Sequence, residues 1–210
     1  TTMAAQHVID QVNEQGGTVW LAHPHWSSIN IIRDTLPLSG FAGIEVFNTL
    51  CRTHGRGESS VIWDDWMDLE NRLYPALAND DSHSHEREMK DTYQGWTMVR
   101  VRERTADAVC AALRSGACYG STGPEIHDIQ MRRIQQPDDS RSVVEATVRC
   151  SEAQRITVVH DRIGIEYRER GKTFEVATFP LRPGARWARV EVVGPDGSKA
   201  WANPVDLTGI

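Results

Sequence analysis

Apolar positions in the first part of the chain follow two patterns, one helical and one strand-like. Val8, Ile9 and Val12 have helical spacing and are followed by a glycine pair at 16–17, which predicts a helix over residues 3–15. Short apolar runs that stop at polar residues predict four strands, within "TVWLAHP", "GFAGIEVFN", "PALANDDSH" and "GWTMVRV". Two further helices are expected.

These two helices have their own signals. The segment "SVIWDDWMDLENRLY" places Ile62, Trp66 and Leu69 on one apolar face. The segment "TADAVCAALRSGA" has Thr105 as its N-cap and Gly116 as its C-cap. Alternation of strands and helices predicts parallel strands joined by crossover helices.

The helical patterns disappear from about residue 125 onward. Short alternating runs separated by turns follow, such as "SVVEATVRC", "RITVVHD", "GIEYRER", "KTFEVATF" and "RWARVEVVG", and they predict a small antiparallel sandwich or sheet. We therefore expect an α/β domain over 1–124 and an all-β module over 125–210. The α/β part offers about four strands, half of what a closed barrel needs. It is either a small open sheet or the C-terminal portion of a longer protein, and the initial "TTM" favours the second.

Composition narrows the function classes. The 29 acidic residues outnumber the 23 basic ones, for a net charge of −6, which disfavours nucleic-acid binding. There is no run of about 18 apolar residues that could span a membrane, and the polar start is unlike a signal peptide. The four cysteines lack CxxC spacing, which favours a reducing compartment. We expect a cytoplasmic protein without nucleic-acid or membrane partners, and the sequence leaves its oligomeric state open.

Candidate chemistry gathers where the predicted strands end. Parallel strands collect functional groups at their C-terminal ends, and residues i and i+2 of a strand project to the same side. Asp81 therefore projects with His83, and His23 with His25 if the strand continues past Pro24. Histidine and carboxylate together suit Zn, Mn or Fe. The alternatives are a core histidine at position 23 and a helix-capping carboxylate at position 80 or 81.

The loop "NTLCRTHGRGE" follows the second predicted strand at the same edge of the sheet. Arg52, His54 and Arg56 could clamp an anionic oxygen there, or form a solvated basic loop. Cys51 suggests a thiol nucleophile, but a packed cysteine fits better because no Cys-His-Asn pattern accompanies it. Gly-x-Ser-x-Gly, Walker and dinucleotide glycine motifs are absent from the sequence.

In order and ensemble, these segments resemble the PHP (polymerase and histidinol phosphatase) metal-dependent hydrolases, in particular their CehA/McbA-like branch. The resemblance rests on "VIDQVNEQGGTVWLAHPH", "GFAGIEVFN", "IWDDWMDLENRLYPALANDDSH", "GWTMVRVRERTADAVCAALRSGACYGSTGPEI" and "RWARVEVVGPDGSKAWANPV". It implies part of a distorted (βα)7, TIM-like barrel with divalent metals. It also implies His23, Asp81 and His83 as metal ligands, with Glu45 and Asn48 beside the ligands or the substrate.

The same resemblance implies a function, and one departure limits it. A phosphoesterase is expected, in which metal-activated hydroxide attacks a small phosphorylated substrate. Arg52 and His54 would bind its oxygens, and His83 or His25 would pass a proton to the leaving group. Carbamate or other ester hydrolysis is the runner-up. The family's opening His-x-His motif is absent, so we expect weak or no activity from this chain alone. The alternative from another class is a non-catalytic half-barrel with a β module that serves for binding.

Overall fold

The computed structural model describes residues 2–26, 31–83, 91–135, 142–161 and 164–210. The chain divides into two compact units, Thr1–Gly120 and Ser121–Ile210. The sequence pattern places its own boundary after residue 124. Each unit has its own buried apolar residues and is described by itself below.

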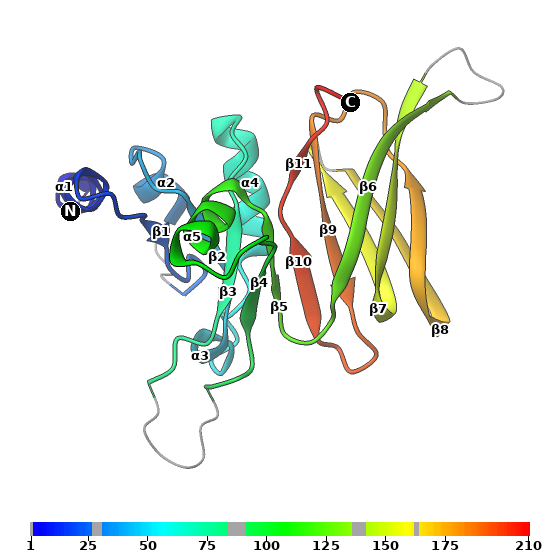
Figure 1. Cartoon of the computed structure of the whole chain (residues 1–210), viewed down its shortest axis with the longest axis horizontal. Helices are drawn as coiled ribbons and strands as arrows, with labels where there is room; N and C mark the ends of the chain where they lie inside the picture. The colour runs from blue at the N-terminus through cyan, green and yellow to red at the C-terminus, as the bar shows by residue number, and fades with distance from the viewer. Residues whose placement is uncertain (1, 27–30, 84–90, 136–141, 162–163) are drawn as a thin grey trace. The chain divides into compact units, whose positions relative to one another are not determined.

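The first unit is built on a parallel sheet of three strands in the order β1-β2-β3 (Figure 1). The strands are β1 (Trp20–Leu21), β2 (Gly43–Asn48) and β3 (Ala76–Asn79). Every residue of β2 is buried, as expected for a central parallel strand. At Gly43 a Cβ atom would lie 2.0 Å from the Pro75 carbonyl oxygen, so only glycine allows β2 and β3 to begin this close together.

In the described part of this unit five short helices accompany the sheet: α1 (Thr2–Glu14), α2 (Ile31–Thr35), α3 (Thr49–Arg52), α4 (Ser60–Glu70) and α5 (Ala106–Ser115). The predicted caps of α5 are confirmed, because Thr105 accepts a hydrogen bond from the backbone of Ala108 and Gly116 has φ 73°. In α4 the buried face is Trp63, Trp66 and Met67, while Leu69 is 61% exposed. None of the helices in the described part of the chain is long and apolar enough to cross a membrane.

Two more short strands, β4 (Trp96–Val99) and β5 (Cys118–Ser121), are neighbours in the sheet order. The Thr97 hydroxyl links β4 to β3, because it accepts from the Ala78 nitrogen at 3.0 Å and donates to the Ala78 carbonyl at 2.9 Å. A stack of Phe41, Trp66 and Tyr74 rings, with centroids 4.6 to 5.2 Å apart, fills the core beside α4.

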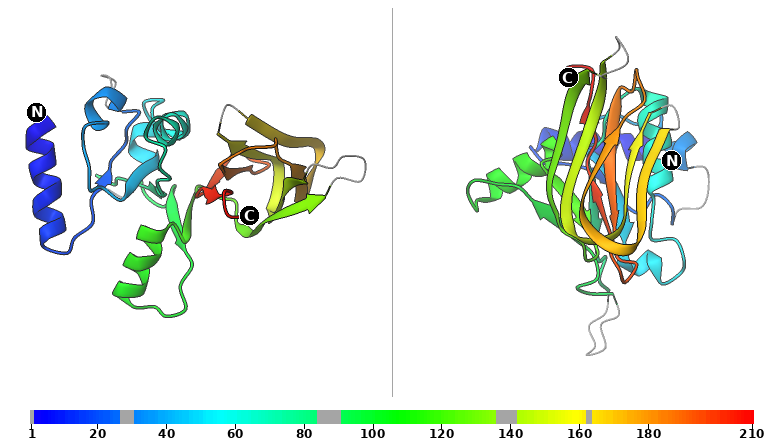
Figure 2. Two further views of the ribbon diagram at one scale, coloured as in Figure 1. Left: turned by 90° about the horizontal axis from the view of Figure 1, so that it is seen from above. Right: turned by 90° about the vertical axis from the view of Figure 1, so that its right-hand side faces the viewer.

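The second unit consists of antiparallel strands (Figure 2). They are β6 (Ile126–Gln135), β7 (Ser142–His160), β8 (Gly164–Pro180), β9 (Trp187–Val193), β10 (Lys199–Ala202) and β11 (Val205–Asp206). The first half of β7 pairs with β6 and its second half with β9, while β8 follows β7 along both halves. Register shifts between Arg149 and Arg155 mark the bend.

The expected fold class, part of a distorted (βα)7 barrel followed by a small sandwich, is wrong. The structure is mainly β-sheet, with 42% of residues in strands and 22% in helices. The crossover segments do not supply the helices that a barrel wall needs: α2 has five residues, α3 has four, and β1 has only two residues to pair with β2. Local alternation of strands and helices is therefore present as a small parallel sheet, without the barrel that the family resemblance implied.

Candidate functional site

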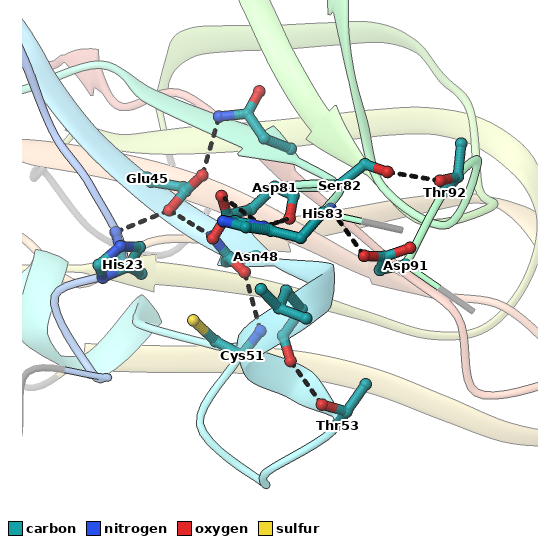
Figure 3. A network of polar contacts seen from close by, with 12 residues as sticks. His23, Glu45, Asn48, Cys51, Thr53, Asp81, Ser82, His83, Asp91 and Thr92 are labelled. Atoms are coloured by element: carbon teal, nitrogen blue, oxygen red, sulfur yellow. Dashed lines mark hydrogen bonds and ion pairs between the residues drawn. The ribbon is translucent and has the colours of Figure 1, made fainter. Parts of the chain in front are cut away.

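The C-terminal ends of β1, β2 and β3 bring polar side chains together around Glu45 (Figure 3). Glu45 lies on β2 and is only 6% exposed. Its Oε2 accepts the backbone N–H of His23 at 2.6 Å and the Asn48 amide at 3.0 Å, and its Oε1 accepts the Asn79 amide at 2.9 Å. Its described donors are all neutral, so a buried negative charge is held here without a cationic partner among them.

Asn48 joins this carboxylate to a second one. Its side-chain nitrogen donates to Glu45 and to Asp81 Oδ2, the latter at 3.1 Å. Its side-chain oxygen accepts the backbone N–H of Cys51 at 2.9 Å, which caps α3. Asn48 thus fixes the end of β2, the start of α3 and the Asp81 side chain relative to one another.

Left-handed backbone marks two of the predicted ligands. His23 has φ 30° and Asp81 has φ 53°, values that side chains other than glycine rarely adopt. Among the described residues two others share this conformation: Asn71, with φ 52°, is the C-cap of α4, and Tyr93, with φ 57°, donates its backbone N–H to Asp80. The first two follow the ends of different strands and both adjoin the Glu45–Asn48 pair. Strained backbone of this kind clusters at functional sites.

The two predicted histidine ligands differ in surroundings. The Nδ1 atom of His23 is buried and has no hydrogen-bond partner among the described residues. His83 has a side chain 68% exposed, with Nδ1 2.7 Å from the Asp81 carbonyl oxygen and 3.7 Å from Asp81 Oδ1. The His83 backbone donates to Asp91 Oδ2 at 2.8 Å. Asp81 and His83 are therefore adjacent, although β3 ends at Asn79 and the contact does not come from strand alternation.

Asp80, the neighbouring carboxylate, has a structural role. Its oxygens accept backbone N–H groups of Tyr93, Gln94 and Gly95 at 2.5 to 2.9 Å, and the Thr49 hydroxyl at 3.0 Å. These contacts anchor the chain that leads into β4. Both side-chain oxygens of Asp80 are engaged in these hydrogen bonds. Asp81, the next residue, accepts the hydrogen bond from Asn48.

The carboxylates affect a nearby thiol. Burial, followed by the negative charges of Asp81 and Glu45, raises the pKa of Cys51 from 9.0 to about 11. Cys51 is 4% exposed, so the thiol is packed and protonated at neutral pH. A nucleophilic cysteine needs the opposite shift. The same two negative charges would favour a cation bound close to them.

The remaining predicted residues lie on exposed segments of the same unit. The backbone N–H of His25 donates to the Ser59 hydroxyl at 3.2 Å, and its Nδ1 atom lies 2.7 Å from the Glu58 carbonyl oxygen. His54 has its ring edge-on to Trp26, with centroids 5.0 Å apart. The Arg52 guanidinium lies 5.9 Å from the centre of the Phe47 ring. Arg56, in the same loop, is exposed.

The predicted ligands His23, Asp81 and His83 have donor atoms that suit a metal ion, but they do not form a complete coordination site. Among the described residues, no group of three or more His, Cys, Asp or Glu side chains is close enough to hold a metal ion. Asp81 and His83 form a pair, and the unpartnered Nδ1 of His23 offers an imidazole donor on the neighbouring segment. Coordination positions beyond these would need water or groups outside the described residues.

Sequence reasoning missed the role of Asn79 and the depth of Glu45. Asn79 is the polar residue at the end of the third predicted strand, where the functional groups of parallel strands collect, and this position could have signalled its role. Asp91 binds the His83 backbone across a segment with no recognisable motif, and no local signal identifies it. Comparison with known proteins adds no identification: no protein-family model, curated protein or solved structure matches this chain.

Proposed function

We propose that the chain is a metal-dependent hydrolase of the PHP type that acts on small phosphorylated substrates. In this proposal His23, Asp81 and His83 contribute to holding a divalent ion, Zn, Mn or Fe. The observation that supports it most is the backbone strain at His23 and Asp81, since both residues flank one buried carboxylate, Glu45, whose described hydrogen-bond donors are all neutral. Backbone strain of this kind is more frequent at functional sites than elsewhere.

Electrostatics support a cation at this place. Glu45 is buried among neutral donors, and one Asn48 amide separates it from Asp81. Two neighbouring carboxylates in a site partly removed from water repel each other unless one takes up a proton or a cation lies near. A divalent ion held by Asp81 and the histidines removes that repulsion.

Each residue has a distinct part in the proposed chemistry. A bound divalent ion lowers the pKa of a water molecule to about 7 and so provides hydroxide near neutral pH. Glu45 keeps the His23 backbone in its strained conformation, and Asn48 orients Asp81. Arg52 and His54 offer donors to the anionic oxygens of the substrate. The exposed His83 can transfer a proton to the leaving group.

The test measures metal binding directly and hydrolysis second. The purified chain is dialysed against Zn²⁺, Mn²⁺ or Fe²⁺ and the bound metal is counted, for the wild type, Asp81→Asn and Asp65→Asn. Asp81→Asn keeps a residue type that tolerates left-handed backbone. Asp65→Asn removes the same charge from the exposed surface of α4.

We expect Asp81→Asn to weaken metal affinity by about 10- to 100-fold. The metal affinity of Asp65→Asn should equal that of the wild type. Turnover of p-nitrophenyl phosphate and bis-p-nitrophenyl phosphate, if measurable in the wild type, should fall in parallel. Less than about a tenth of an equivalent of metal in the wild type would overturn the proposal, as would equal affinity in all three proteins. Either result would favour a non-catalytic binding role.

A further inference from the structure

Tyr93, in the first unit, lies next to the candidate site and is exposed. Its backbone N–H donates to Asp80 Oδ2 at 2.5 Å. The hydroxyl of Thr92, the residue before it, lies 2.7 Å from the Ser82 hydroxyl (Figure 3). Asp80 and Ser82 are the two sequence neighbours of Asp81, so these contacts place the backbone of Tyr93 beside a proposed metal ligand.

The backbone at Tyr93 is set by Asp80 and does not itself favour a tyrosine. Three successive N–H groups, those of Tyr93, Gln94 and Gly95, donate to the Asp80 carboxylate at 2.5 to 2.9 Å. Successive N–H groups that enclose an anion in this way form a nest, and Tyr93 has the left-handed φ of 57°. Glycine and asparagine adopt that conformation at a lower cost than a bulky side chain does.

Packing does not account for the tyrosine either. The residue is 83% exposed, so its ring removes little apolar surface from water. A strained backbone and an unburied ring both count against tyrosine in the isolated chain. Such costs are typical of residues that contact a ligand.

A second exposed aromatic residue, Trp26, lies at the same edge of the sheet. Its backbone N–H donates to the His23 carbonyl at 2.9 Å, its ring is edge-on to His54, and it is 41% exposed. In the strand order β1-β2-β3, Trp26 follows the first strand, and Tyr93 is bound to Asp80, which follows the third. Exposed aromatic residues therefore accompany both outer strands at the edge that carries the candidate site.

We propose that Tyr93 contacts the substrate and that its ring binds an aromatic ring carried beside the phosphate. This inference rests on the proposed function and narrows its substrate class to phosphate esters of ring-bearing alcohols. Two aromatic rings attract each other in offset-stacked and edge-to-face arrangements, beyond the effect of buried area. Arg52 and His54 serve the anionic oxygens in the proposed function, and Tyr93 serves the other end of the molecule.

The test is isothermal titration of the full chain with phenylphosphonate and with methylphosphonate. The two probes share an anionic group that is not hydrolysed and differ in the ring. The chain is loaded with whichever of Zn²⁺, Mn²⁺ and Fe²⁺ it binds most tightly. Tyr93→Asn removes the ring and suits left-handed backbone, while Tyr93→Phe keeps the ring. The matched control is Tyr167→Asn, which removes a tyrosine that is 60% exposed on β8 of the second unit.

We expect the wild type to bind phenylphosphonate about tenfold more tightly than methylphosphonate. Tyr93→Asn should reduce this preference to within about twofold and leave the methylphosphonate affinity unchanged. Tyr93→Phe and Tyr167→Asn should keep the wild-type preference. In turnover of phenyl phosphate, Tyr93→Asn should raise KM and leave kcat unchanged, because the ring takes no part in the chemical step.

Three results would overturn the inference. The first is the same preference for phenylphosphonate in Tyr93→Asn as in the wild type. The second is an equal loss of preference in Tyr167→Asn, which would indicate an effect unrelated to the site. The third is a lower urea midpoint or loss of folding in Tyr93→Asn, which would show that the ring stabilises the folded chain and that packing explains the tyrosine.

Failure of this inference can be told apart from failure of the hydrolase proposal. A chain that retains no metal is recognised by the metal count, and that result overturns both. A chain that binds metal and both phosphonates, but with equal affinity for the two probes, overturns the role of Tyr93 alone and leaves the metal site standing.

Discussion

Cys51 reports on the charge of the carboxylate cluster, and its reactivity gives a first prediction. The pKa of its thiol is raised to about 11 by burial, Asp81 and Glu45. With a chelator present, we expect alkylation of Cys51 by iodoacetamide to be slow at pH 8 and to rise steadily toward pH 11, because only the thiolate reacts. Peptide mass mapping measures it, and exposed Cys110 serves as the control within the same chain.

The same shift has consequences for stability. A thiol whose pKa is raised in the folded state favours the folded state fully below its unfolded value of 9.0. That contribution is lost as the pH rises from 9 to about 11. Asp81→Asn removes one of the raising charges, so Cys51 should react faster at pH 9 than in the wild type. An unchanged alkylation rate would contradict a close electrostatic contact between the two residues.

The period of a strand did not by itself decide the direction of the individual site residues. Asp81 and His83 are adjacent in the structure, but β3 ends at Asn79 and Asp81 has left-handed backbone, so strand alternation does not account for their contact. The central position of Glu45 was not predictable, because it depends on the backbone N–H of His23 reaching across from another strand. The left-handed conformation at His23 likewise has no signal in the neighbouring residues of the sequence.

Helix α5 offers a prediction about one secondary-structure element. Thr105 accepts the Ala108 N–H at 3.2 Å and so satisfies one of the free donors of the first turn. Thr105→Ala should lower the free energy of unfolding by about 1 kcal/mol, measured by urea denaturation. Thr105→Ser keeps the hydroxyl and should stay close to the wild type. Equal losses in both variants would show that the methyl group, and not the cap, stabilises the helix.

Elements with strong end signals were predictable, while their faces and lengths were less so. Gly116 and Thr105 define α5 in the sequence as in the structure. In α4 the three tryptophan and methionine side chains, and not Leu69, face the core, because the Phe41 and Tyr74 rings stack on that side. The sequence predicts two short strands where the structure has the single strand β7. A bulge takes the place of the expected turn, so β7 pairs with β8 on both sides of it.

The architecture of the chain was the least predictable level. Alternating apolar runs indicate that strands and helices alternate, but they do not say how many strands pair. Here β2 pairs with two neighbours, while β7 and β8 pair along most of their length, which shifts the structure toward antiparallel sheet. Pairing partners far apart in sequence, such as β7 with β9, are set by tertiary packing that no local window contains.

Because the chain has two units, we expect a mutation in the core of one unit to destabilise that unit and leave the other intact. Ile156 is fully buried on β7 within the second unit, so Ile156→Ala should cost about 2–5 kcal/mol through lost burial and a cavity. Hydrogen exchange should then quicken in β7, β8 and β9 while β2 and β3 keep their protection, because each unit has its own core. Ile156→Val is the matched control, with a loss of about 0.5–1.5 kcal/mol. Equal acceleration in both units would instead mean that the chain unfolds as one cooperative body.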